Sequence, residues 1–164
     1  MKKVLKIVIP LILVALCLVG YYKFIYVPAG ETFRIKYENL KRDYKGQVKE
    51  VKTGFVKNGF HTRVVFQKVG ELIDYTFDVT NDGTIPAKLA MNPIYFGKDN
   101  WFKKYMFATF TYADDTEVKK GDVINPGETK TFKYHISYYE EGDMADKEGF
   151  HFETTVFLLY VQNR

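Results

Sequence analysis

Apolar and polar side chains alternate along most of the sequence after residue 30, and this two-residue period restricts the fold more than any other feature. Successive side chains on a β-strand point to opposite faces, so the period predicts strands with one buried and one solvated face. The clearest examples are residues 72–80 and 129–139. The side chains expected in the core are Phe77, Val79, Phe132, Tyr134 and Ile136, and those expected outside are Lys133, His135 and Ser137.

Short strand-like runs follow one another at intervals that suit a β-sandwich. They cover residues 60–67, 72–80, 85–91, 105–113, 129–139 and 151–162, and residues 31–37 and 46–52 add one or two more. Glycine, asparagine, aspartate and proline mark the junctions between them. We therefore expect an all-β domain, an antiparallel immunoglobulin-like or jelly-roll β-sandwich of seven or eight strands. Residues 92–104 are expected to form a short helix or an irregular crossover between the sheets.

The stretch "YTFDVTNDGTIPAKL", residues 75–89, contains a strong turn signal between two alternating runs. Glycine after aspartate favours a tight hairpin turn, because glycine accepts the positive φ that such turns require. The pattern predicts a β-hairpin that turns at Asp82 and Gly83. The side chain of Asn81 is expected to bond backbone groups at this corner.

The last strand-like run, residues 151–162, is the most apolar stretch outside the amino-terminal region. Because residues 156–161 show almost no polar alternation, both faces of this segment are expected to be covered. A strand in the middle of its own sheet would achieve this, and so would an edge strand covered by a neighbouring molecule. The central position is favoured, because a domain without disulfides needs this apolar area in its own core.

The first 29 residues differ in composition from the rest. Lys2, Lys3 and Lys6 precede an uncharged apolar run over residues 7–22. A cleaved signal peptide, a lipoprotein signal and an uncleaved anchor are the three interpretations. Cys17 follows Leu16 inside the run, and no good small-residue cleavage pattern follows it, so the anchor is favoured. We expect one amino-terminal transmembrane helix within residues 4–26.

These features predict two parts, an anchor with its juxtamembrane segment (residues 1–29) and an extracytoplasmic domain (residues 30–164). Positive charge tends to remain in the cytoplasm, which places the larger part outside the cell as a single-pass protein of the cell membrane. The sole cysteine, Cys17, lies in the expected anchor, so the domain has no disulfide. The first 29 residues hold four lysines and no acidic residue, which leaves the domain with 20 basic and 20 acidic side chains.

Basic residues are concentrated in "KRDYKGQVKEVK", residues 41–52. A solvated strand face is the simpler interpretation, and contact with an anionic wall polymer or with lipid headgroups is the other. Nucleic acid is not expected as a partner, because the chain has no basic-aromatic motif and its domain is expected outside the cell. A cell-envelope polymer or a surface protein remains as a possible class of partner.

No familiar catalytic pattern is present, and the chain is not expected to be an enzyme. His61, His135 and His151 do not form H-E-x-x-H, and G-x-S-x-G is absent. The acidic loop with Asp114, Asp115 and Asp122 would suit one weak calcium site, but a solvated turn is favoured. We expect no metal and no cofactor.

The segment Trp101, Phe102, Lys103 and Lys104 is the one candidate for an exposed aromatic contact surface. Aromatic side chains beside lysines can offer both apolar area and charge to a partner. The alternative is that Trp101 closes one end of the sandwich, and this structural role is favoured.

Two stretches resemble a known family. They are "KVGELIDYTFDVTNDGTIPAKL", residues 68–89, and "VINPGETKTFKYHISY", residues 123–138. Together they are similar to exported immunoglobulin-like or jelly-roll sandwich proteins of Gram-positive bacteria, of the TasA/camelysin group, over about residues 68–139. The resemblance implies an extracellular structural or adhesive role, with strand donation as a route to assembly.

The expected function is therefore that of a membrane-anchored extracellular binding or structural module of the cell surface. A secreted subunit of a biofilm matrix or fibre, released by signal cleavage, is the alternative. A second and less favoured alternative is an enzyme with an unrecognised site.

Overall fold

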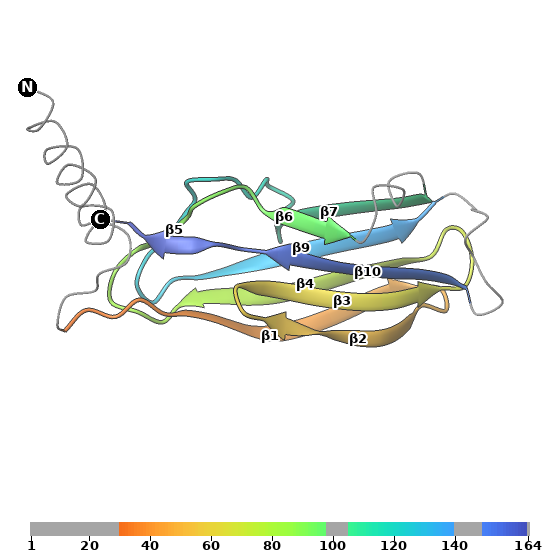
Figure 1. The fold of residues 1–164 in the computed structure, drawn as a ribbon, viewed down its shortest axis with the longest axis horizontal. Coiled ribbons are helices and arrows are strands. Elements are labelled where there is room, and N and C mark those ends of the chain that lie inside the picture. Colours follow the sequence, from red (N-terminus) through yellow and green to blue (C-terminus); the bar gives the residue numbers. More distant parts are fainter. Residues whose placement is uncertain (1–29, 98–104, 140–148, 164) are drawn as a thin grey trace, which may run out of the picture.

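The computed structural model describes residues 30–97, 105–139 and 149–163, drawn in colour in Figure 1. The expected anchor, residues 1–29, lies outside the described residues. In the described ranges, no helix is long and apolar enough to cross a membrane. The described chain is all-β, and every strand pair in it is antiparallel.

Three sheets make up the fold (Figure 1). In spatial order, the first contains β1 (Ile35–Lys45), β4 (Leu72–Asn81), β9 (Thr129–Tyr138) and β7 (Met106–Tyr112). The second contains β2 (Lys49–Val56), β3 (Gly59–Phe66), β10 (Phe150–Phe157) and β6 (Ile94–Gly97). The third, short sheet contains β11 (Tyr160–Gln162), β5 (Ala87–Leu89) and β8 (Val123–Ile124).

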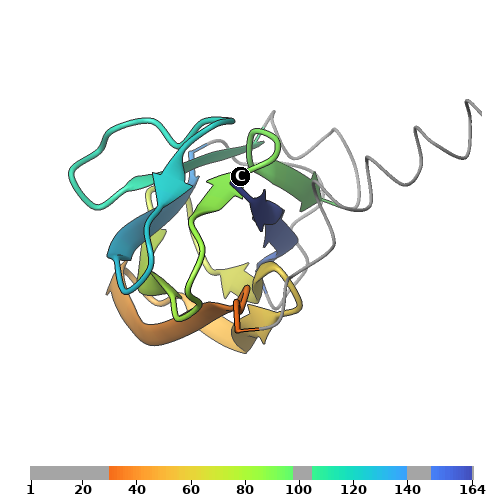
Figure 2. The same cartoon turned by 90° about the vertical axis from the view of Figure 1, so that its left-hand side faces the viewer.

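The two four-stranded sheets lie on opposite sides of the domain, as the end-on view shows (Figure 2). The buried residues between them form a core that is rich in aromatic side chains. Phe60 of β3 stacks on Phe77 of β4 with ring centroids 5.2 Å apart, so the contact joins the two sheets. Phe132 stacks on Phe110 at 5.3 Å within the first sheet. The five side chains predicted for the core are all at most 1% exposed, namely Phe77, Val79, Phe132, Tyr134 and Ile136. The alternating pattern therefore predicted the inward phase of β4 and β9 correctly.

The number of strands exceeds the predicted seven or eight. The described residues form eleven, of which seven are seven residues or longer. The other four have two to four residues each. Such short strands carry too few side chains to show an alternating pattern. One of them, β6, lies within residues 92–104, where a short helix or irregular crossover was expected, and residues 98–104 are outside the described residues.

The predicted hairpin over residues 75–89 is wrong. β4 pairs with β1 and β9, whereas β5 pairs with β11 and β8 in another sheet. The turn at Asp82 and Gly83 is a corner at which the chain passes from one sheet to the next. The chain does change direction at Asp82 and Gly83, as predicted. The partners of β4 and β5, however, come from distant parts of the chain.

Gly83 is required at this corner for a different reason from the one predicted. Its φ is not positive, unlike that of Gly70 or Gly127. Instead, a Cβ atom at this position would collide with the carbonyl oxygen of Thr32. Thr84 donates its backbone N–H to that same carbonyl at 2.9 Å. Glycine thus allows the corner to lie directly against the first described segment.

The carboxy-terminal run occupies the centre of the second sheet, as favoured from the sequence, because β10 lies between β3 and β6. The expectation that both faces are covered is wrong. Val156 and Leu158 are buried, whereas Phe157 is 38% and Leu159 is 41% exposed. The segment therefore alternates in burial although its sequence does not alternate in polarity.

Candidate functional site

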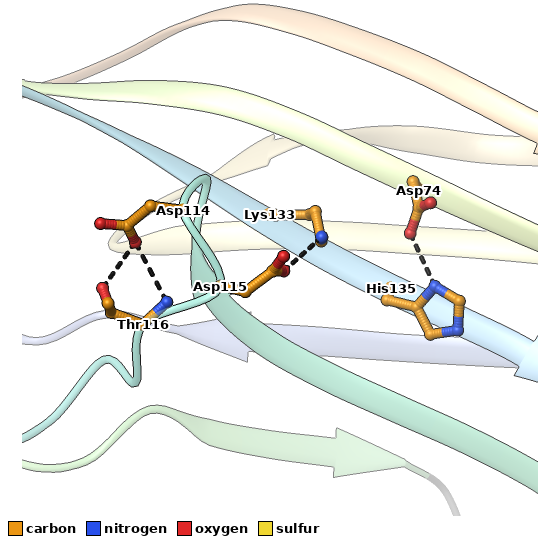
Figure 3. Close-up of polar contacts among 6 residues, drawn as sticks. All are labelled: Asp74, Asp114, Asp115, Thr116, Lys133 and His135. Carbon is orange, nitrogen blue, oxygen red and sulfur yellow. Dashed lines mark hydrogen bonds and ion pairs between the residues drawn. The ribbon is translucent and has the colours of Figure 1, made fainter.

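Polar side chains cover the outer face of β4 and β9, where the registers of the two strands bring them into cross-strand pairs (Figure 3). Asp74 lies opposite His135, and their Oδ1 and Nδ1 atoms are 2.7 Å apart. Further along β9, Lys133 forms an ion pair with Asp115 of the neighbouring loop (Figure 3). The hydrogen bond to Asp115, together with the negative charge of that carboxylate, raises the pKa of the Lys133 ammonium. The sequence predicted His135 to face outward but gave no sign of Asp74 as its partner.

Asp78 connects three strands on the same face. Its carboxylate accepts a hydrogen bond from Asn39 Nδ2 of β1 at 2.8 Å and one from Thr131 Oγ1 of β9 at 2.7 Å. These two hydrogen bonds hold the pKa of Asp78 below its usual value. Asn39 has a φ of 57° at the irregularity in β1, so Asp78 also fixes an unusual backbone conformation.

The three aspartates of the possible calcium site have separate partners. Asp114 accepts hydrogen bonds from the hydroxyl and the N–H of Thr116 at 2.6 and 3.0 Å, which lower its pKa (Figure 3). Asp115 pairs with Lys133, and Asp122 accepts from Tyr112 Oη at 2.8 Å. In the described ranges, no three His, Cys, Asp or Glu residues are grouped so that they could hold a metal ion.

A shallow depression of about 410 Å³ lies beside this loop. It is lined by Tyr112, Ala113, Asp114, Thr116, Lys130 and Thr131. Lys130 Nζ lies 5.2 Å from the centre of the Tyr112 ring, so the cation already has an aromatic partner. The lining therefore holds satisfied polar groups and lacks the enclosed apolar wall that is usual for small-molecule sites.

The aromatic and basic segment Trp101, Phe102, Lys103 and Lys104 lies outside the described residues. Both interpretations of it, as a contact surface and as a plug for the sandwich, stay predictions.

The main run of basic residues in the described structure lies on two edge strands. β1 is at the edge of the first sheet and β2 at the edge of the second, and they follow each other through the turn at residues 46–48. We call residues 41–52 the β1–β2 edge. Its four lysines are exposed, and no ion pair in the described structure includes any of them. They are Lys41, Lys45, Lys49 and Lys52.

One ion pair holds the two strands of this edge together. Arg42 of β1 forms an ion pair with Glu50 of β2, with 2.8 Å between Nε and Oε2, which ties the edges of the two sheets together. Tyr44 and Val51 lie beside the lysines and are 54% and 49% exposed. The sequence identified the basic run, but neither the Arg42–Glu50 pair nor the exposure of the two apolar side chains followed from the alternating pattern.

A buried carboxylate holds the turn at the end of the β1–β2 edge. Glu71 is 1% exposed and accepts backbone N–H groups from Gln47 at 2.8 Å and from Gln67 at 2.6 Å. Lys68 provides a third N–H at 3.3 Å. Gly46, at a φ of 102°, has no room for a Cβ because the Glu71 side chain occupies that space. A buried charge of this kind is tolerated because several donors surround it.

Comparison with protein-family models, with curated proteins and with solved structures finds no match for this chain.

Proposed function

We propose that the chain is a membrane-anchored protein whose β-sandwich acts outside the cell as a binding or structural module of the envelope. The observation that carries this proposal is the order of its parts. A lysine-rich start and an apolar run at residues 7–22 precede the first described residues of the sandwich by a short segment, residues 23–29. Such an order suits a single anchor that displays one domain.

The arrangement of the ends of the domain supports a display role. The backbone N–H of Thr32 bonds Thr84 Oγ1 at 2.8 Å, and that of Asn163 bonds the Pro86 carbonyl at 2.9 Å. The first and last described residues therefore lie at the same end of the elongated sandwich (Figure 1). The turns at residues 46–48 and 67–71 lie toward the other end, which an anchored domain would present away from the bilayer.

The order of the strands favours an immunoglobulin-like sandwich over a jelly roll. The first sheet has the order β1-β4-β9-β7, and β6 lies beside β10 in the second. This order corresponds to strands A-B-E-D with C beside F in an immunoglobulin domain. The β2–β3 pair then counts as an insertion between A and B that takes the place of strand G.

The resemblance to the TasA/camelysin group belongs to the same proposal. Its two motifs touch at the corner described above. Asn81 receives the N–H of Gly127 on its carbonyl at 2.8 Å and donates its own N–H to the Glu128 carbonyl at 3.1 Å. This contact gives a physical reason for both motifs to occur in one chain. It supports the interpretation that what the chain has in common with the group is the scaffold and not an active site.

Fractionation of cells that express the chain with a carboxy-terminal tag tests the proposal. We expect the full-length chain in the membrane pellet and loss of the tag when protease is added to intact cells. A shortened species in the medium would favour the secreted matrix subunit. Protection of the tag until the cells are lysed would contradict both.

A further inference from the structure

We infer that the β1–β2 edge binds a flexible anionic polymer, and this inference rests on the proposed extracellular position of the domain. Residues 41–52 hold five basic and two acidic side chains, although the domain as a whole is formally neutral. Arg42 is already paired with Glu50. Of the remaining charges in the run, only Asp43 offsets the four exposed lysines defined above, so the edge keeps a local net positive charge. Lys41 also interacts with Asp78 of β4.

The geometry of the edge suits an extended partner. Lys41 and Lys45 lie opposite Thr76 and Leu72 of β4, so both belong to the outer face of the first sheet. Residues four apart on a strand are separated by about 13 Å. Lys49 and Lys52 of β2 lie opposite Val65 and Arg63 of β3, on the outer face of the second sheet, so the lysines flank both sides of the edge at which the two sheets meet. Lysine offers a point charge without the fixed fork of arginine, so this surface would select for charge density more than for one ligand shape.

The β1–β2 edge lies far from the end of the domain at which the described chain begins. This distance favours a polymer over the lipid headgroups of the anchoring bilayer as the partner. β1 has 11 residues and runs from the end where the described chain begins toward the turn at residues 46–48. At about 3.3 Å per residue, this strand spans roughly 35 Å. Charges on exposed groups are screened within about 8–10 Å at physiological salt. An anchored, upright domain would therefore hold the edge beyond the electrostatic reach of its own membrane.

Two further features suit a polymer. The exposed Tyr44 and Val51 give apolar area between the charges. The backbone under the lysines is held by the Arg42–Glu50 pair and by the Glu71 carboxylate at the adjoining turn. A surface whose backbone is already ordered loses little conformational entropy on binding.

The test uses the full chain in non-ionic detergent and inorganic polyphosphate as the probe. One variant replaces the edge lysines, K41Q/K45Q/K49Q/K52Q. The matched control removes the same charge elsewhere, K57Q/K88Q/K119Q/K120Q. A flexible polyanion releases about 0.7 counterion per neutralised charge, so the wild type should show a slope of about −3 in log K against log salt. The edge variant should lose about tenfold or more in affinity at low salt and most of the slope, and the control should keep both.

Equal losses in the two variants would overturn the inference, because they would show a general charge effect. Absence of polyphosphate binding by the wild type would overturn it as well. So would edge-dependent binding to phosphatidylglycerol vesicles without binding to the polymer, which would assign the lysines to lipid headgroups. The assay is independent of topology in cells, so its failure is distinguishable from failure of the proposed extracellular position.

Discussion

Asn81 shows at the scale of one residue how a buried polar side chain can specify a fold. It is 0% exposed, and its amide donates to the carbonyls of Ile85 at 2.8 Å and Ile124 at 2.9 Å. Its Oδ1 accepts the N–H of Gly83 at 3.0 Å. The sequence predicted bonds to the local corner, and Ile85 and Gly83 are such partners. Ile124 is 43 residues away, and nothing local could have indicated it.

Replacement of Asn81 by alanine should destabilise the domain by about 2–4 kcal/mol, because three buried or partly buried backbone groups lose their partner. Asn81→Asp should be at least as harmful, since a carboxylate would face two carbonyl oxygens. Asn125→Ala, at an exposed position, should cost less than about 1 kcal/mol. Chemical denaturation of the full chain in detergent measures all three. An aspartate variant as stable as the wild type would contradict the described hydrogen bonds.

The lowered pKa of Asp78 predicts a pH dependence. A carboxyl group whose pKa is lower in the folded state stabilises the fold above its unfolded pKa, about 4. That stabilisation is lost as the pH falls through the lower, folded value. Asp78→Asn should therefore be less stable than the wild type by about 1 kcal/mol at neutral pH, and the difference should disappear in acid. A difference that is the same at neutral and acid pH would show that the ionised carboxylate contributes nothing.

At the scale of elements, residues 113–122 are a loop in which each aspartate has its own partner. Because the carboxylates do not converge, addition of calcium should leave the melting temperature unchanged. A site with a Kd of about 10 µM would add roughly 2.7 kcal/mol at about 1 mM calcium. A rise of several degrees that EDTA reverses would contradict the described arrangement and restore the calcium site.

The position of β10 predicts that the carboxy-terminal segment is indispensable. β10 lies between β3 and β6, and residues 153–164 contribute Val156, Leu158 and Tyr160 to the core. Deletion of residues 153–164 should therefore prevent folding, as shown by loss of the near-ultraviolet circular dichroism signal. A truncated chain that stays folded and monomeric, while the full chain self-associates, would instead make this segment an assembly element.

Local pattern predicted β3, β4, β7, β9 and β10 and the inward faces of β4 and β9, but not the partners of these strands. It placed the first two strands only in part, at residues 31–37 and 46–52, whereas β1 and β2 cover Ile35–Lys45 and Lys49–Val56. Apolar and polar residues alternate along most of β4 and β9, and both strands were predicted with the correct phase. The pairing of Asp74 with His135 joins residues 61 positions apart, which no local signal encodes. β5 and β8 are too short to show a two-residue period in the sequence. Because β5 pairs with β8 and β11 and not with β4, the turn predicted to close a hairpin is a corner between two sheets.

At the scale of the whole molecule, charge and shape give the domain two unlike ends. The third sheet lies at the end where the described chain begins and finishes. The basic residues of the β1–β2 edge lie toward the other end. The proposed anchor sets which of these ends faces the bilayer. The orientation of the chain in the membrane is therefore the claim on which the proposed function and the polymer-binding edge both depend.

Cysteine labelling in intact cells measures that orientation most directly, because Cys17 is the only native cysteine. In a Cys17→Ser background, one variant carries Lys57→Cys, at an exposed position in the β2–β3 turn, and another carries Lys3→Cys. A membrane-impermeant maleimide should label the first variant in intact cells and the second only after lysis. Labelling of Lys3→Cys in intact cells, with Lys57→Cys protected until lysis, would contradict the proposed placement of the sandwich outside the cell.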